Sequence, residues 1–272
     1  MSPRPKAFRQ LMQFLGPMVR DRLAKEKEFG PDWSDKPNDL ISWLIEDAAP
    51  ADRTVPGIAM RILIMNMAAI HTITMTFADA LFNLTMYPTH IQPMREEVER
   101  AIKQDSWTKT AIDKMHKLDS FFRESQRLNG SSVVAMNRKV VAKTGFKFSD
   151  GTVIPFESFV AVSGQLVQHD PANYDHPEDF DGFRFSRMRE AVGQSDQSKK
   201  YMVSTAPEHL DFGLGKHACP GRFFAATELK AMLAHVLLKY DIKAYGEGVR
   251  PPPFFGSGKP NPTVKIYFRK RQ

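Results

Sequence analysis

Cysteine is almost absent from this chain, since Cys219 is the only one among 272 residues. A single cysteine excludes an internal disulfide framework and a zinc site built from several cysteines. A lone cysteine is most often a small buried apolar residue, so the surrounding sequence must supply any argument for chemistry.

Long apolar runs and strong charge runs are also missing. The most apolar stretch, residues 58–77, is interrupted by Arg61, Asn66 and His71, which favours a helix buried in protein over a transmembrane segment. The first ten residues lack the apolar core of a signal peptide. The net charge of +7 is spread along the chain, apart from a short basic run at residues 269–271, so we expect no nucleic-acid partner.

The first half of the chain is predicted to be helical because apolar residues recur there at spacings of three and four. The third helix has about 28 residues and would be about 42 Å long, enough to cross a domain. It is apolar nearly all round, which predicts a buried central helix. The expected helices cover residues 6–28, a segment opening at 37–39, then 57–85, 91–103 and 110–128.

The second half shows short β-branched runs separated by turn signals, followed by an irregular segment rich in Pro, Asp and Gly. We therefore predict a mainly α fold with small β-sheets, forming a single domain over residues 1–272. A long irregular segment inside a compact domain usually serves a function. The expected strands cover residues 133–134, 140–141, 153–154, 160–162 and 264–268, the irregular segment 171–209 and the last helix 222–239.

The irregular segment leads into the string FGLGKHACPGRFFA, residues 212–225. Gly213 and Gly215 let the backbone turn sharply, and Pro220 after Cys219 suits the first turn of the next helix. A thiolate at this position faces the positive end of the helix dipole, which favours the ionised sulfur. Such a thiolate with one open side suits the axial position of a haem iron.

This string resembles the haem-binding loop of cytochrome P-450 monooxygenases, in which a Phe, two glycines, a Cys and a Gly follow in fixed order. The resemblance implies that Cys219 is the metal ligand of a haem (heme b, iron protoporphyrin IX), in a loop covering about residues 212–222. The alternative is a buried cysteine in a glycine-rich turn. The cofactor-binding residues implied by the pattern are Phe212, Gly213, Gly215 and Gly221.

Glu124 and Arg127 stand three residues apart on a predicted helix, so they share a face and can pair. Such pairs also occur by chance on solvated faces. In FRESQRL the pair resembles the Glu-x-x-Arg of the same family, and Arg184 in HPEDFDGFRF would be the third member of its ion-pair network. The resemblance implies a structural role, holding the segment that presents Cys219.

The string AAIHTIT, residues 68–74, resembles the oxygen-handling stretch of the family's long helix. Thr72 matches the family threonine, whose hydroxyl can hold water and relay protons. His71 stands where the family has an acidic residue, so its role is open between proton donor and ordinary helix histidine. Thr72 and His71 are the candidate catalytic residues.

Two further basic residues fall on family positions that contact the haem propionates, His217 and Arg138. Their alternatives are an ordinary surface histidine and arginine. The residues expected to line the substrate pocket are Met65, Ala68, Ala69 and the segments 132–134 and 254–257.

Family members are about twice as long as this chain, which resembles the C-terminal half of the fold. The resemblance implies a monooxygenase that takes electrons from an NADPH-dependent reductase and oxidises an apolar small molecule, with fungal members that modify terpenoids and other secondary metabolites as the nearest likeness. We expect an intracellular protein without a transmembrane segment, whereas full-length relatives are often anchored in the endoplasmic reticulum membrane.

Two alternatives stay open at this point. One is a truncated, non-catalytic fragment that binds haem weakly or not at all. The other is a hydrolase using Cys219 and His217, which is disfavoured because these residues are two apart and no orienting partner is apparent.

Overall fold

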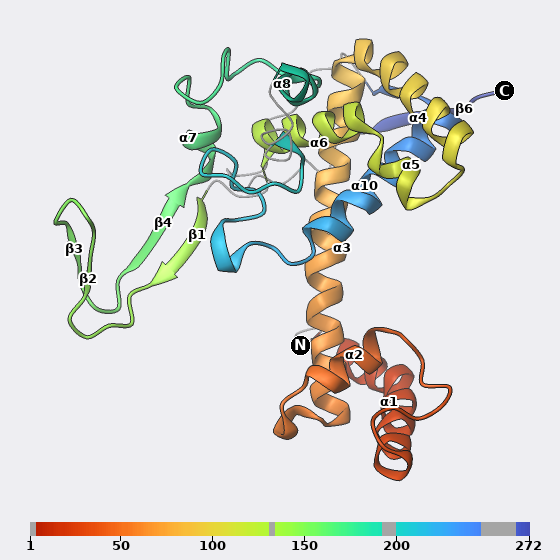
Figure 1. The fold of residues 1–272 in the computed structure, drawn as a ribbon, viewed down its shortest axis with the longest axis vertical. Helices are drawn as coiled ribbons and strands as arrows, with labels where there is room; N and C mark the ends of the chain where they lie inside the picture. Colours follow the sequence, from red (N-terminus) through yellow and green to blue (C-terminus); the bar gives the residue numbers. More distant parts are fainter. Residues whose placement is uncertain (1–3, 131–133, 192–199, 246–264) are drawn as a thin grey trace. The chain divides into compact units, whose positions relative to one another are not determined.

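The computed structural model describes residues 4–130, 134–191, 200–245 and 265–272. The fold is mainly helical with small antiparallel sheets, as the sequence predicts (Figure 1). The chain divides into two compact units, Met1–His71 and Thr72–Gln272, and the division falls within the long helix α3 (Val55–Met86).

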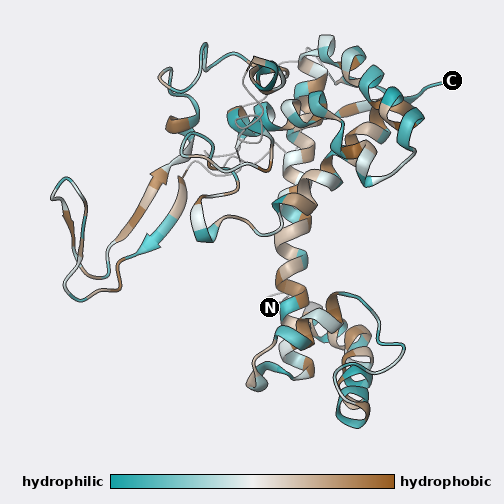
Figure 2. Cartoon of the chain, in the orientation of Figure 1, coloured by the Kyte–Doolittle hydropathy of each residue, from teal (hydrophilic) through white to brown (hydrophobic). Residues whose placement is uncertain are grey.

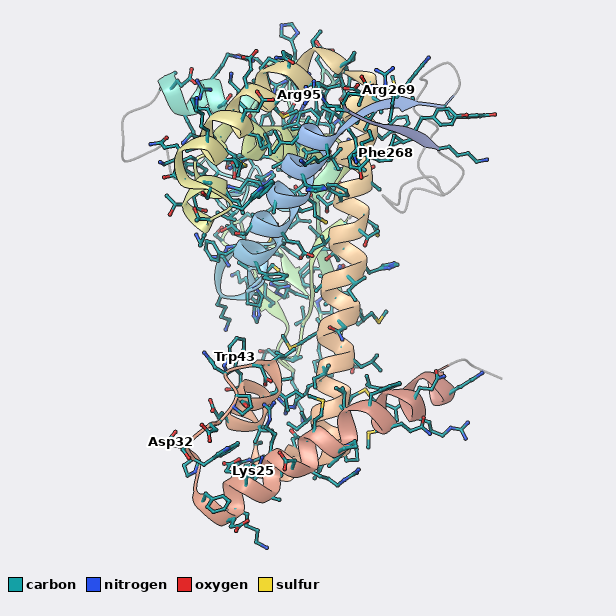
Figure 3. All side chains as sticks on the ribbon, turned by 90° about the vertical axis from the view of Figure 1, so that its right-hand side faces the viewer. Lys25, Asp32, Trp43, Arg95, Phe268 and Arg269 are labelled. Atoms are coloured by element: carbon teal, nitrogen blue, oxygen red, sulfur yellow. The ribbon has the colours of Figure 1, made fainter. Side chains whose placement is uncertain are left out.

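The first unit contains α1 (Arg4–Phe29), α2 (Leu40–Asp47), a short 3-10 turn (Pro50–Asp52) and the beginning of α3. Asp39 caps α2, since its carboxylate accepts the backbone N–H groups of Ile41 and Ser42 at 3.1 and 3.2 Å. Arg22 donates to both carboxylate oxygens of Asp39 at 2.7 and 2.8 Å, and this hydrogen bonding lowers the pKa of Asp39 to about 2. The buried apolar core consists of Val19, Ile41, Ile45, Ala48, Ile58 and Ile62, while Trp43 on α2 is exposed (Figure 3).

The middle of α3 is exposed, which contradicts the prediction of a helix buried along its length. Ile64, Met67 and Ile70 have exposed fractions of 60%, 73% and 65%, on a helix that is largely apolar (Figure 2). Apolar sequence favours burial, but burial also needs a covering element, and the described residues of the first unit supply none for this stretch. By length and composition alone α3 could cross a membrane; 17% of its most apolar window is buried, and core helices of soluble proteins pass the same test.

The second unit begins with the end of α3 and is built around helices α4 (Ile91–Asp105), α6 (His116–Asn129) and α10 (Arg222–Lys239). Helix α6 is buried continuously from Leu118 to Arg127, charged residues included. Buried apolar side chains that fill the unit include Leu84, Met94, Val98, Leu118, Phe121, Phe122, Leu229, Leu233 and Leu237.

The single helix predicted over residues 110–128 is wrong, because the chain forms α5 (Lys109–Asp113) and then α6. Glu97 of α4 explains the break. Its buried carboxylate accepts the backbone N–H groups of Lys117 and Leu118 at 2.9 and 3.2 Å, which satisfies the free donors at the start of α6. A partner distant in sequence therefore fixes where α6 begins.

Three two-stranded antiparallel sheets complete the second unit. Strand β1 (Val134–Lys139) pairs with β4 (Phe159–Ser163), β2 (Phe146–Lys147) with β3 (Val153–Ile154), and β5 (Tyr240–Ala244) with β6 (Ile266–Lys270). The strand predicted at residues 140–141 is wrong, although Val140 still exchanges backbone hydrogen bonds of 2.9 Å with Ser158 and Glu157. Val133 and Val264 lie outside the described residues.

Two short helices interrupt segments where none was expected: α7 (Gly164–Gln168), directly after β4, and α8 (Arg184–Ala191), inside the predicted irregular segment. The last strands are joined to α4 by charge pairs. Arg95 of α4 and Arg269 of β6 donate to the two carboxylate oxygens of Asp241 at 3.3 and 3.0 Å (Figure 3).

Candidate functional site

The loop that carries Cys219 is shaped by glycines and by its own backbone hydrogen bonds. Gly213 and Gly215 have φ values of +70° and +68°, a region that favours glycine. The N–H of Cys219 donates to the carbonyl of Phe212 at 2.8 Å, which closes residues 212–219 into a loop, the Cys loop. Helix α10 begins at Arg222, so the sulfur lies close to the positive end of that helix.

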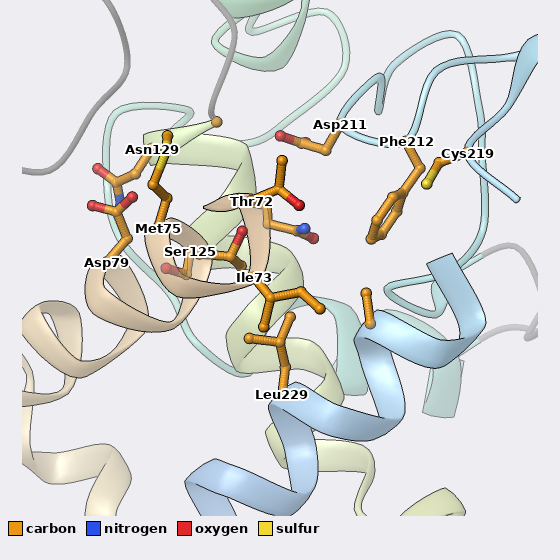
Figure 4. A pocket seen from close by; sticks show the side chains of 14 residues that line it. Thr72, Ile73, Met75, Asp79, Ser125, Asn129, Asp211, Phe212, Cys219 and Leu229 are labelled. Atoms are coloured by element: carbon orange, nitrogen blue, oxygen red, sulfur yellow. The ribbon is translucent and has the colours of Figure 1, made fainter. Parts of the chain in front are cut away.

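Cys219 opens onto a pocket of about 680 Å³, counting its open mouth. Phe212 and Cys219 come from the Cys loop and Thr72 from α3, while the end of α6 supplies another wall (Figure 4). The thiol is free and partly exposed. The lining residues are apolar (Ile73, Met75, Phe212, Ala225, Leu229) and polar (Thr72, Thr76, Asp79, Ser125, Gln126, Asn129, Asp211), with Gly130 and Cys219.

The remaining predicted site residues are not brought to this pocket. His217 and Arg138 are exposed and do not line it; Arg138 lies on β1 and donates to the Asn137 carbonyl at 2.9 Å. His71 is exposed on α3 and belongs to the first unit. These three assignments stay predictions.

The predicted substrate-pocket residues are not tested by the structure. Met65, Ala68 and Ala69 belong to the first unit. Ser132 and the 254–257 segment lie outside the described residues.

Glu124, Arg127 and Arg184 do come together, as one fully hydrogen-bonded network. The Glu124 carboxylate, with an exposed fraction of 0%, accepts from Arg127 Nε and Nη2 at 2.9 and 2.8 Å and from Arg184 Nε at 3.2 Å. It also accepts the backbone N–H of Asp181 at 3.1 Å. Buried charges of both signs therefore satisfy one another.

This network contacts the segment 168–184 rather than the Cys loop. Arg127 donates to the carbonyls of Gln168 and Pro177 at 2.8 and 2.6 Å, and Arg184 donates to the carbonyl of Asp175 at 2.6 Å. No hydrogen bond seen from the three charged side chains to other described residues reaches residues 212–221. The network is linked toward the Cys loop through Gln168 and also through Tyr174, whose ring lies under the Arg127 guanidinium and whose hydroxyl donates to the Glu208 carbonyl at 2.8 Å.

The site also contains buried polar residues that the sequence did not reveal. Asp211 hydrogen-bonds with Gln168 of α7, and burial raises its pKa to about 7. His209 is 1% exposed, and burial together with the charge of Arg123 lowers the pKa of its imidazole well below the usual value. Asp211 directly precedes Phe212, so its position in the chain could have indicated that it lies near the site. Nothing in a single sequence, however, marks the side chains of Asp211 and His209 as buried.

Asp211 predicts a specific pH dependence of stability. Its pKa is raised from 3.8 in the unfolded chain to about 7, so the native state binds the extra proton between these values. The contribution of Asp211 to the free energy of unfolding is therefore fully present below about pH 4 and is lost as the pH rises through 7. The free energy of unfolding falls with pH by at most about 1.4 kcal/mol per pH unit.

Urea unfolding of the wild type and of Asp211→Asn from pH 4.5 to 8.5 measures this slope. We expect the free energy of unfolding of the wild type, relative to the variant, to fall up to about pH 7 and then to level off. The contribution of His209 is common to both proteins and largely cancels. Parallel curves would show that Asp211 titrates as an ordinary carboxylate.

Comparison with known proteins gives a consistent result. The sequence model of the family "Cytochrome P-450" matches residues 4–268. Cytochrome P-450 monooxygenase 151 of Postia placenta is 45% identical over 98% of this chain and 54% of its own length. Cytochrome P-450 monooxygenase olcJ of Penicillium canescens is 38% identical over 95% of this chain and 48% of its own length.

The chain spans about half the length of the curated relatives it matches. The match nevertheless extends over nearly all of its residues, including α3, the Glu124 network and the Cys loop. With a family match over residues 4–268 and relatives above 40% identity, the chain belongs to the cytochrome P-450 family.

Proposed function

We propose that this chain binds haem through the thiolate of Cys219 and contributes the oxygen-handling half of a haem-thiolate monooxygenase. The observation that carries the proposal is the pocket in which Cys219 and Thr72 are brought together from the Cys loop and α3. When bound, the haem supplies the reductive activation of dioxygen.

The residues around Cys219 fit such a group. The sulfur is free, partly exposed and next to a helix N-terminus, which stabilises an anionic soft ligand. Gly221 leaves the space beside the sulfur open, because a Cβ there would lie 3.9 Å from Cys219 Sγ. Phe212, Ala225 and Leu229 offer the apolar walls that a flat, largely apolar macrocycle needs.

The chain's own residues have distinct parts in the proposed reaction. Cys219 donates electron density as a thiolate ligand. Thr72 presents a hydroxyl that can hold a water molecule and pass a proton within the pocket. His217 and Arg138 would pair with the propionates, and His71 is a second candidate proton donor.

Further elements of the proposal concern partners. Because the relatives are named monooxygenases, we propose an NADPH-dependent reductase as electron donor and an apolar small molecule as substrate. A terpenoid or another secondary metabolite is the finer proposal, supported by the fungal origin of the relatives.

Haem titration of the purified 272-residue chain tests the proposal. We expect one haem per chain and, after reduction and addition of carbon monoxide, the red-shifted Soret band typical of thiolate ligation. Spectra that remain a simple sum of free haem and protein would favour the alternative of a non-catalytic fragment.

Thr72→Ala should leave haem content unchanged while lowering the yield of product per electron pair, because the hydroxyl that delivers a proton is lost. We expect more hydrogen peroxide and less product during turnover. Thr74→Ala is the matched control, since Thr74 is exposed on the same helix and does not line the pocket. His71→Asp, assayed alongside, would report on the histidine. Equal product-to-peroxide ratios in wild type, Thr72→Ala and His71→Asp would remove both residues from proton delivery.

A further inference from the structure

A buried polar cluster joins the beginning of the Cys loop to the end of α6. The Asp211 carboxylate hydrogen-bonds with Gln168 of α7, and the His209 ring lies beside it, with Nδ1 3.5 Å from Asp211 Oδ2. Gly130, directly after α6, leaves the room that this arrangement needs. A Cβ at Gly130 would lie 2.8 Å from Asp211 Oδ1 and 3.0 Å from the Gln126 carbonyl, closer than side chains tolerate.

The cluster is buried but incompletely hydrogen-bonded. The side chains of His209 and Asp211 are 1% and 7% exposed. Within the part of the chain that the structure describes, neither ring nitrogen of His209 nor Oδ2 of Asp211 has a hydrogen-bond partner. Burying a polar atom without a partner is unfavourable, so we expect a change of protonation in this cluster to alter its hydrogen bonds.

Several charged or titratable groups face the cluster from the surrounding elements. Arg123 and Arg127 act on it from α6, and both disfavour a protonated His209. Arg123 also favours ionisation of Asp211, but burial outweighs it. Glu124 is paired with Arg127. Tyr174 and Glu208 belong to the flanking loops, and Asp79 of α3 lines the same pocket as Asp211.

The cluster is linked to Cys219 by a short path. Asp211 precedes Phe212, and the Phe212 carbonyl accepts the N–H of Cys219 at 2.8 Å (Figure 4). Upstream, His209 exchanges backbone hydrogen bonds with Ala206 at 2.9 and 3.4 Å. Asp211 is therefore the direct neighbour of the residue whose carbonyl closes the Cys loop.

We propose that Asp211, Gln168 and His209 form a polar latch that positions the Cys loop, closed while Asp211 carries its proton and open once that proton has left for solvent. Ionisation places an uncompensated negative charge in a buried site, and relief requires the carboxylate to move toward water. The raised pKa of Asp211 places the transition near neutral pH. The latch is a positioning device, and it rests on the proposed function only in treating Cys219 as the ligand to be positioned.

The test uses the only cysteine of the chain as its reporter. The 272-residue protein, without added haem, is treated with N-ethylmaleimide between pH 5.5 and 8.5, and the rate of Cys219 labelling is measured. Wild type is compared with Asp211→Asn, which cannot ionise, and with Asp150→Asn, which removes an exposed carboxylate on a distant turn. Because all three proteins carry the same single thiol, the ratio of rates isolates the effect of Asp211.

We expect the ratio of wild type to Asp211→Asn to be near one at the acid end and to rise about fivefold by pH 8, while wild type and Asp150→Asn stay equal. Gln168→Leu, which removes the hydrogen bond to Asp211 but keeps the carboxyl group, should label faster than wild type at the acid end and at the same rate by pH 8. If the labelling rate of wild type divided by that of Asp211→Asn stays constant over this pH range, the proposal is overturned.

If Asp211→Asn does not fold, hydrogen exchange in the unmodified chain tests the proposed latch instead. Exchange in residues 209–219 should then accelerate with pH more steeply than the intrinsic chemical rate, and exchange that follows the intrinsic rate overturns the latch. Neither measurement involves haem, so a chain that fails to bind haem would refute the proposed function without changing these outcomes.

Discussion

Glu124→Ala is expected to lower the free energy of unfolding by about 3–5 kcal/mol, because it leaves the buried guanidinium of Arg127 and the partly exposed one of Arg184 without their carboxylate. Glu124 accepts four hydrogen bonds at 2.8–3.2 Å, three from Arg127 and Arg184 and one from the Asp181 backbone. Backbone carbonyls also accept hydrogen bonds from Arg127 and Arg184. These carbonyls satisfy the N–H groups of the two arginines, but they carry no full negative charge. We therefore expect a protein that is recovered poorly or melts much earlier, rather than a stable inactive one.

Glu157→Ala is the matched control for this substitution. Glu157 pairs with Lys139 at 3.0 Å, but both side chains are largely exposed, so the loss should be about 0–1 kcal/mol. Urea unfolding followed by circular dichroism measures both variants. Equal stability losses in the two variants would mean that the buried network contributes no more than a surface ion pair.

Cys219→Ser is expected to abolish thiolate ligation completely, because a neutral hydroxyl is a poor ligand for ferric iron. The red-shifted Soret band expected from reduced, carbon-monoxide-bound wild type should be absent from this variant. The substitution changes one atom in a partly exposed side chain, so the fold should be retained. Ala218→Ser places the same hydroxyl on the neighbouring residue and should behave as wild type. A red-shifted band that survives in Cys219→Ser would show that the sulfur is not the ligand.

The sequence predicts those features whose cause is local. The three-residue spacing of Glu124 and Arg127 places both side chains on one face of α6, and they pair there. The glycines of the Cys loop occur where the backbone has positive φ. Most helices begin and end within a few residues of the expected positions because apolar periodicity and Pro or Gly signals act within one turn.

The features that the sequence did not predict depend on distant partners. The break before α6 needs the Glu97 carboxylate, twenty residues earlier in the chain. The apolar middle of α3 is exposed because burial depends on covering elements, which local periodicity does not report. The burial of Asp211 and His209 has no periodic signature, since a polar residue beside a turn normally predicts exposure.

The central claim is that Cys219 places a thiolate on a haem iron. Its most direct test is the absorbance spectrum of the haem-loaded 272-residue chain after reduction and addition of carbon monoxide. Thiolate ligation predicts the strongly red-shifted Soret band that electron donation from sulfur produces. A band at the position of imidazole-ligated haem, or no complex at all, would contradict the claim.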